Sequence, residues 1–254
     1  MMLAPMGACF LTGASSGIGR SLARRLAREG RAMALVARRK DLLDTLVLEI
    51  EAEGGQALAI ACDVTDRDAV RAAVARAEAG LGPIALLVAN AGGAEAGTSS
   101  AAGFRSEVFS ATYAQNVASV LYCVEAVLPG MLDRGEGHLV ATSSLAGELG
   151  LPNAGAYSSA KAALTRLMES LRVELGATGV DVTILVPGFI RTKPGGKANR
   201  PFVLELEDAT ARIHRAIARR RPVFVFPWTL AWGIRLVRVL PVRLRDRLLR
   251  AAVS

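Results

Sequence analysis

A glycine-rich turn near the amino terminus constrains the fold of this chain more than any other stretch. Residues 7–12 form a short apolar run that predicts a buried strand, and helical spacing of apolar residues follows the turn. Between them, Gly13, Gly17 and Gly19 are spaced G-x3-G-x-G. A strand, a glycine-rich turn and a helix amino terminus bring backbone N–H groups to one place, which suits a pyrophosphate. The alternative is a tight strand-to-helix turn that binds nothing.

The same alternation of apolar runs and helical patterns continues along the chain. Predicted strands occupy residues 7–12, 32–37, 56–61, 84–89, 137–143, 180–186 and 222–227. Predicted helices occupy about 41–53, 66–79, 104–132 and 202–220, with a further long one near residue 157. The sequence therefore predicts an α/β fold, a doubly wound parallel sheet of the Rossmann type in a single domain.

No linker divides the predicted fold. We expect residues 1–221 to form a dinucleotide-binding and catalytic domain with a lid at about 188–220. Residues 222–254 are expected to add a seventh strand and a basic amphipathic C-terminal extension to the same domain.

The end of the second predicted strand indicates which cofactor is bound. Proteins that prefer NAD place an acidic residue here, about twenty residues after the glycine turn, to bind the ribose 2′-hydroxyl. This chain has Ala37 followed by Arg38 and Arg39. Guanidinium groups suit a 2′-phosphate, so the two arginines favour NADP(H) over NAD(H). The alternative is that they only form the basic start of the next helix.

Tyr157 and Lys161 lie four residues apart in a segment with helical spacing, so both side chains share one helix face. A free Tyr has a pKa of about 10. A cation roughly 5 Å away, at an effective dielectric constant of about 20, would lower that pKa by about two units. The pair predicts a tyrosine suited to acid–base catalysis, although Tyr and Lys also fall four apart on many solvated helix faces.

Two other polar positions are informative only in combination. Asn116 has apolar neighbours in the helix predicted at 104–132, and a polar side chain on an apolar face needs a hydrogen-bond partner. Ser143 and Ser144 follow each other at the end of a strand, where adjacent side chains point to opposite faces. The two serines therefore cannot both enter one site.

In order and spacing, these segments resemble the short-chain dehydrogenase/reductase family. The resemblance covers about residues 6–195 and rests on Thr12-Gly13-x3-Gly17-x-Gly19, Asn90-Ala91-Gly92, Asn116, Ser144, Tyr157-x3-Lys161 and Pro187-Gly188-x3-Thr192. Ser144 is matched in preference to Ser143 because the family's catalytic Ser lies thirteen residues before its Tyr.

The resemblance implies a role for each matched residue. The catalytic residues would be Asn116, Ser144, Tyr157 and Lys161. Tyr157 would be the general acid/base, and Ser144 would hydrogen-bond the substrate oxygen. Lys161 would lower the pKa of Tyr157 and hold the nicotinamide ribose, while Asn116 would keep a water that links Lys161 to solvent.

The resemblance also implies the cofactor site. Asp63 would contact the adenine, Asn90 the adenosine ribose and Thr192 the nicotinamide carboxamide. The full set of cofactor-binding residues would be Gly13, Ser15, Ser16, Gly17, Ile18, Gly19, Arg38, Arg39, Asp63, Val64, Asn90, Ala91, Gly92, Tyr157, Lys161, Pro187, Gly188, Ile190 and Thr192.

Composition argues against a disulfide-stabilised, a metal-binding and a membrane-spanning protein. Cys9, Cys62 and Cys123 are far apart and lie in or beside apolar segments, which predicts reduced core thiols and a cytoplasmic protein. Two histidines without a carboxylate cluster predict no metal site. The chain has no uninterrupted apolar run long enough to span a bilayer.

The positive charge is concentrated at the carboxyl end. Residues 1–199 carry 19 Lys and Arg against 19 Asp and Glu, whereas residues 200–254 carry 12 Arg against four acids. A nucleic-acid enzyme would spread basic residues around its cleft, so we expect no nucleic-acid partner. Residues 228–250 combine two Trp and six Arg in an amphipathic pattern. This tail could cover the lid, join subunits of a homodimer or homotetramer, or lie on an anionic membrane.

Two functions follow from these features. The first is an NADP(H)-dependent oxidoreductase that transfers a hydride between nicotinamide and a carbonyl or secondary alcohol of a fairly apolar small molecule. The second is a catalytically silent NADP(H)-binding sensor. A sensor would not need Ser144 and Tyr157 together, which favours the enzyme. Substrate specificity is expected from residues 93–103, residues 145–154 and the lid after Gly188.

Overall fold

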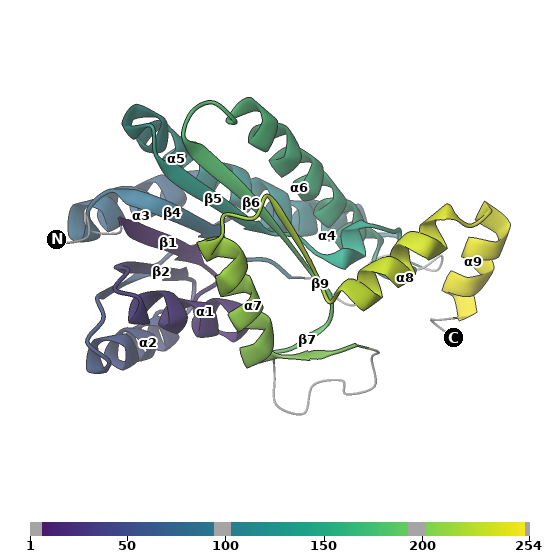
Figure 1. Ribbon diagram of the computed structural model, residues 1–254, viewed down its shortest axis with the longest axis horizontal. Helices are drawn as coiled ribbons and strands as arrows, with labels where there is room; N and C mark the ends of the chain where they lie inside the picture. The colour runs from purple at the N-terminus through teal and green to yellow at the C-terminus, as the bar shows by residue number, and fades with distance from the viewer. Residues whose placement is uncertain (1–6, 94–102, 193–201, 252–254) are drawn as a thin grey trace.

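The computed structural model describes residues 7–93, 103–192 and 202–251, and its centre is a seven-stranded sheet (Figure 1). Neighbouring strands are parallel, in the order β3-β2-β1-β4-β5-β6-β9. These strands are β1 (Ala8–Thr12), β2 (Met33–Ala37), β3 (Ala57–Ala61), β4 (Ile84–Ala89), β5 (Gly137–Thr142), β6 (Val180–Pro187) and β9 (Val223–Phe226). The predicted fold class is confirmed.

Helices cover both faces of the sheet (Figure 1). The helices are α1 (Gly17–Arg28), α2 (Lys40–Ala52), α3 (Arg67–Leu81), α4 (Ser106–Tyr113), α5 (Ser119–Arg134), α6 (Gly155–Glu174), α7 (Leu206–Ala218), α8 (Trp228–Val239) and α9 (Val242–Ala251). One hydrophobic core packs α1, α2 and α7 against the sheet, and the other packs α3, α5 and α6 against the opposite face.

Side chains alternate between these two cores along each strand, which explains why the strands are apolar throughout. In β1, Phe10 joins the core under α3 and α5, while Cys9 and Leu11 join the core under α1 and α2. Strands buried on both faces are typical of parallel sheets. Cys9, Cys62 and Cys123 are all buried and free, as predicted for core thiols.

The strand order reverses at β1, which has β2 on one side and β4 on the other. Ligands of such sheets bind outside the carboxyl ends of the strands at this switch point. The register pairs Thr12 with Val36 and Leu11 with Val88, so the three strands end at one edge. The glycine turn, Arg38 and Asn90 follow directly from that edge.

The prediction of a continuous α-helix at 104–132 is wrong, because the helix is interrupted. A π-helical turn at Ala114–Ala118 separates α4 from α5. By length and composition alone, the combined run Ser106–Arg134 could cross a membrane. Val120, Val124 and Met131 of this run pack in the core against the sheet, so it is explained as a core helix.

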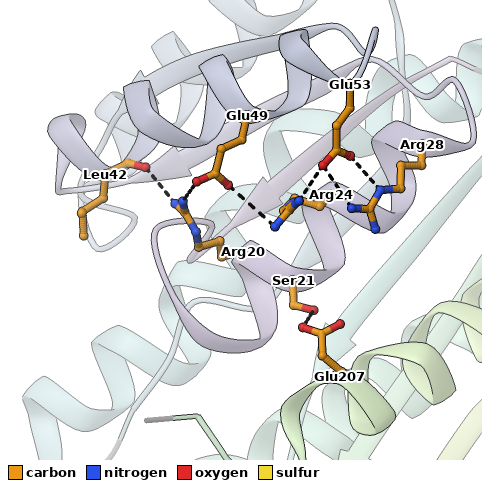
Figure 2. Close-up of polar contacts among 8 residues, drawn as sticks. All are labelled: Arg20, Ser21, Arg24, Arg28, Leu42, Glu49, Glu53 and Glu207. Atoms are coloured by element: carbon orange, nitrogen blue, oxygen red, sulfur yellow. Dashed lines mark hydrogen bonds and ion pairs between the residues drawn. The ribbon is translucent and has the colours of Figure 1, made fainter. Parts of the chain in front are cut away.

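Figure 2 shows that ion pairs join α1 to Glu49 and Glu53 at the second half of α2, and that a hydrogen bond joins α1 to α7. The Arg20 guanidinium forms an ion pair with Glu49 at 2.5 Å, and Glu53 forms ion pairs with both Arg24 and Arg28. Ser21 Oγ donates to Glu207 of α7 at 2.9 Å. Because α1 begins at the glycine turn, these contacts hold that turn against α2 and α7.

The carboxyl end of the chain departs from the sheet after β9. The helix predicted at 202–220 is shorter, Leu206–Ala218, and a two-residue strand β8 (Leu204–Glu205) precedes it and pairs with β7 (Ile190–Arg191). Two helices, α8 and α9, then extend away from the body (Figure 1). Most of the proposed specificity loop at 93–103 and the lid segment 193–201 lie outside the described residues.

Candidate active site

The glycine turn is held closely against the end of β4. Gly13 and Gly17 have φ of 70° and 53°, a region that favours glycine. A Cβ on Gly13 would lie 3.0 Å from the Asn90 side-chain nitrogen, and a Cβ on Gly19 would collide with the Gly13 carbonyl. Thr12 Oγ1 accepts the backbone N–H groups of Asn90 and Ala91, each at 3.0 Å. Glycines are therefore required here by close backbone packing.

An open cleft of about 920 Å³ lies along this edge of the sheet. Its lining includes most of the predicted cofactor residues: Gly13, Ser15, Ser16, Gly17, Ile18, Arg38, Arg39, Asp63, Val64, Asn90, Ala91, Gly92 and Thr192. The Ser16 side chain makes no capping hydrogen bond to α1. The first N–H groups of a helix need such partners, so this helix start is open to an anion.

Gly19, Pro187, Gly188 and Ile190 were also predicted to bind the cofactor, but they are not part of the cleft lining. Gly19 packs beneath the Gly13 carbonyl, and Pro187 is buried at the end of β6. A Cβ on Gly188 would lie 2.9 Å from Leu230 of α8. Ile190 belongs to the small strand β7.

Charged side chains surround the cleft near the ends of β2 and β3. The Arg39 guanidinium donates to Ser15 Oγ at 2.9 Å and Ser16 Oγ at 3.2 Å. Asp63 accepts hydrogen bonds from the backbone and hydroxyl of Thr65, which lower the pKa of its carboxyl. The charge of Arg38 lowers that pKa further. Arg38 therefore lies close enough to the exposed Asp63 carboxylate to interact with it, while Arg39 is bonded to the glycine turn.

Lys161 is buried at the other end of the site. Its side chain is 3% exposed, and Nζ donates to the Thr142 carbonyl at 2.7 Å. Burial lowers the pKa of this ammonium to about 8, so it stays mostly protonated at neutral pH. A Cβ on Gly92 would lie 3.3 Å from Nζ, which places the ammonium next to the cleft lining.

Tyr157 lies one helical turn before Lys161 on α6, with its ring centroid 5.7 Å from Nζ. Burial raises the pKa of the phenol, and a hydrogen bond with Ser144 lowers it in part. This direction is opposite to the depressed pKa that the spacing of Tyr157 and Lys161 predicted. The physical reason is that removal from water disfavours the phenolate more than the other groups favour it. The phenol is therefore protonated at neutral pH.

The two serines after β5 point to different places. Ser143 Oγ contacts the Lys161 carbonyl at 3.0 Å and Thr165 Oγ1 at 2.6 Å, which ties β5 to α6. Ser144 precedes a short 3-10 turn and lies beside the Tyr157 phenol. Of the two, Ser144 is the one next to the tyrosine.

Asn116 lies in the π-helical turn and is fully buried. Its Nδ2 donates to the carbonyls of Gly93 at 2.8 Å and Thr112 at 2.9 Å, and its Oδ1 accepts from the Gly93 N–H at 3.3 Å. The side chain thus has the partners that its apolar surroundings demand. It fastens the helix to the loop after β4, and its expected role in keeping a water stays a prediction.

Some groups at the site were not predicted from the sequence. The Thr142 carbonyl holds Lys161, but a backbone acceptor leaves no side-chain signal. Gly93 and Gln115 also line the cleft. The only sequence signal for them is that they are adjacent in the chain to Gly92 and Asn116, which were predicted. Thr12 belongs to the glycine motif, and its buried hydroxyl links β1 to β4.

Comparison with known proteins finds related sequences and similar folds. The sequence model for short chain dehydrogenase matches residues 8–201. An uncharacterized oxidoreductase of Myxococcus xanthus is 41% identical over 238 residues, covering 93% of both chains. A short-chain dehydrogenase of Sphingobium yanoikuyae in complex with NADPH has a TM-score of 0.79 and 27% identity, covering 93% of this chain and 97% of that one. A short-chain dehydrogenase/reductase of Burkholderia phymatum in complex with NAD has a TM-score of 0.81 and 26% identity, covering 93% and 95%.

Proposed function

This chain belongs to the short-chain dehydrogenase/reductase family of oxidoreductases, and we propose that it is an NADP(H)-dependent carbonyl reductase or alcohol dehydrogenase. Its substrate would be a fairly apolar small molecule. The observation that supports this proposal is that Tyr157 contacts both Ser144 and Lys161, and that Lys161 lies next to Gly92 of the cleft lining.

The cleft fits a dinucleotide. Its volume of about 920 Å³ lies at the upper end of the range for ligand pockets, roughly 300–1,000 Å³. The glycine turn would hold the pyrophosphate with the open N–H groups of α1. Asp63 and Val64 would contact the adenine, and the segment Asn90–Gly92 the adenosine ribose. Pro187, Gly188, Ile190 and Thr192 would surround the nicotinamide end.

Arg38 supports NADP(H) as the cofactor. Structural neighbours in this family hold NADPH or NAD, so a nicotinamide cofactor is common to both. In this chain Arg38 and Arg39 line the cleft at the position where an NAD-binding carboxylate would stand. Arg39 is already bonded to Ser15 and Ser16, so Arg38 is the residue that we assign to the 2′-phosphate.

The buried side chains would carry the proton chemistry. When bound, the nicotinamide would supply or accept the hydride. Tyr157, protonated at neutral pH, would donate its phenol proton to the carbonyl oxygen of the substrate during reduction. Ser144 would hold that oxygen in place. Lys161 has three N–H donors and gives one to Thr142, so the others can bind the ribose hydroxyls.

Members of this family bind small-molecule substrates and usually form oligomers. We propose that this chain is a homodimer or homotetramer, which light scattering of the purified protein would measure.

The experiment that tests the proposed function measures NADPH oxidation by the purified protein with a panel of ketones and aldehydes of increasing apolar surface. Turnover of at least one compound, faster with NADPH than with NADH, is the expected result. Tight NADPH binding without turnover of any compound would contradict it and favour the alternative, a nucleotide sensor.

A further inference from the structure

The outer face of α8 is apolar and exposed. Trp228, Trp232, Leu236 and Val239 are 68%, 57%, 62% and 79% exposed. Their spacing of four, four and three residues places them along one side of the helix. The opposite side, with Leu230 and Ile234, packs against the hydrophobic core. One side of α8 therefore anchors the helix, and the tryptophan side remains exposed to solvent.

The next helix, α9, is amphipathic but buries none of its residues. Leu244 and Leu248 are 46% and 45% exposed, one turn apart. Figure 1 shows α9 standing off from the sheet, beyond the far end of α8. Exposed apolar side chains that are contiguous on a surface mark interaction sites. We call the exposed residues of Trp228–Arg250 the C-terminal surface.

Arginines border this apolar area. The segment contains six Arg and a single acid, Asp246. Within the part of the chain that the structure describes, Arg243, Arg247 and Arg250 have no acidic partner. Arg235 lies over the Trp232 ring at 6.0 Å, next to the apolar side. The C-terminal surface is thus cationic, while residues 1–199 are balanced in charge.

We propose that the C-terminal surface binds the anionic surface of a lipid bilayer. Tryptophan and aliphatic side chains enter the headgroup region, and arginines beside them meet anionic headgroups. Binding is peripheral, since both helices are short and the surface is amphipathic. This inference does not depend on the proposed function, because it concerns a surface outside the cleft.

Charge argues against a second copy of the chain as the occupant. A two-fold interface places the same patch on both subunits. Here it would bring one set of unpaired arginines against an identical set, and like charges across an interface disfavour association. An anionic lipid surface provides the opposite charge.

Helix α8 lies next to segments that were predicted to bind the substrate. The Arg238 guanidinium contacts Glu148 at 3.4 Å, four residues after Ser144, and Leu230 lies next to Gly188. Docking of the C-terminal surface therefore brings the substrate side of the site close to the lipid. If the proposed function holds, apolar substrates can enter from the bilayer.

The test is co-sedimentation of the full-length protein with phosphatidylcholine vesicles, with and without phosphatidylglycerol. We expect at least ten-fold stronger binding to the anionic vesicles, and loss of that binding at about 0.5 M salt. Binding to neither vesicle, or equal binding to both, would overturn the proposal.

Paired variants identify the surface. Arg243→Gln with Arg247→Gln should weaken binding about twenty-five-fold, because each basic residue near an anionic surface contributes roughly five-fold. Trp232→Ser with Leu236→Ser should weaken it at least as much. The control, Leu48→Ser with Arg76→Gln, changes an equally exposed leucine on α2 and an arginine on α3 and should bind as the wild type. Unchanged binding in both tail variants, or an oligomer that dissociates in them without any vesicle binding, would overturn the proposal.

Discussion

The two ends of the candidate site use polar side chains in opposite ways. At the Tyr157 end, Lys161 and Asn116 are buried, and each is held by backbone carbonyls. At the Arg38 end, Arg38, Arg39 and Asp63 are exposed to solvent. Buried groups are fixed in position and removed from water, whereas exposed groups interact through solvent. We infer that the buried end determines rate and the open end determines which cofactor is bound.

The largest expected effect is at the buried end. Tyr157→Phe keeps the ring and removes the proton donor, so turnover should fall by roughly a hundred- to ten-thousand-fold. The dissociation constant of NADPH should stay nearly unchanged. Steady-state kinetics and fluorescence titration measure the two quantities. Tyr122→Phe, which removes a phenol from α5, is the control. A Tyr157→Phe protein with more than about a tenth of wild-type activity would contradict the assignment.

The next effect is a pH dependence of stability. Burial lowers the pKa of Lys161 to about 8 from its ordinary 10.5. Between these values the folded protein loses a proton that the unfolded chain keeps, so the free energy of unfolding should rise with pH, by up to roughly 3 kcal/mol. Below about pH 8 the lysine is charged in both states, and this gain is absent. Urea denaturation across pH should show the rise in wild type and Lys40→Met but not in Lys161→Met. Equal slopes in all three proteins would contradict burial as the cause.

At the open end, we expect a change in cofactor choice. Hydrogen bonds from Arg38 to a 2′-phosphate contribute about 1.5–3 kcal/mol, a preference for NADPH of roughly ten- to a hundred-fold. Ala37→Asp with Arg38→Ala should reverse that preference, as measured by the two dissociation constants. Lys40→Ala, just outside the cleft, is the control. Equal wild-type affinities for NADPH and NADH would refute the role of Arg38.

The smallest expected effect is at Asp63. Asp63→Asn keeps an oxygen that can accept from Thr65 but removes a negative charge near Arg38. The NADPH dissociation constant should then fall by about two- to five-fold, since exposed charges interact by about 1 kcal/mol or less. The dissociation constant of NADH should change less, because NADH has no 2′-phosphate. An equal change for both cofactors would place Asp63 away from that phosphate.

Much of the sheet and of the cleft could be predicted from the sequence. Strands buried on both faces leave near-continuous apolar runs, and the residues that follow them, Gly13, Arg38 and Asn90, line the cleft. Such signals are local, because the strand and the residue after it are adjacent in the chain.

Other features depend on contacts between distant segments. The π-helical turn accompanies hydrogen bonds between Asn116 and Gly93, 23 residues away. The raised pKa of Tyr157 comes from burial, which a helical spacing cannot measure. The amphipathic pattern of residues 228–250 also does not reveal that Leu230 and Ile234 pack against the core while both tryptophans are exposed.

The contrast between the two ends of the site is tested most directly by measuring cofactor affinity and hydride-transfer rate in the same set of variants. NADPH dissociation constants and single-turnover rates of hydride transfer at saturating NADPH are measured for wild type, Tyr157→Phe and Arg38→Ala. We predict that Tyr157→Phe lowers only the rate, by at least about a hundred-fold, and that Arg38→Ala weakens only NADPH binding, by at least about ten-fold. A variant that changes rate and affinity to the same extent would contradict the division of roles between the two ends.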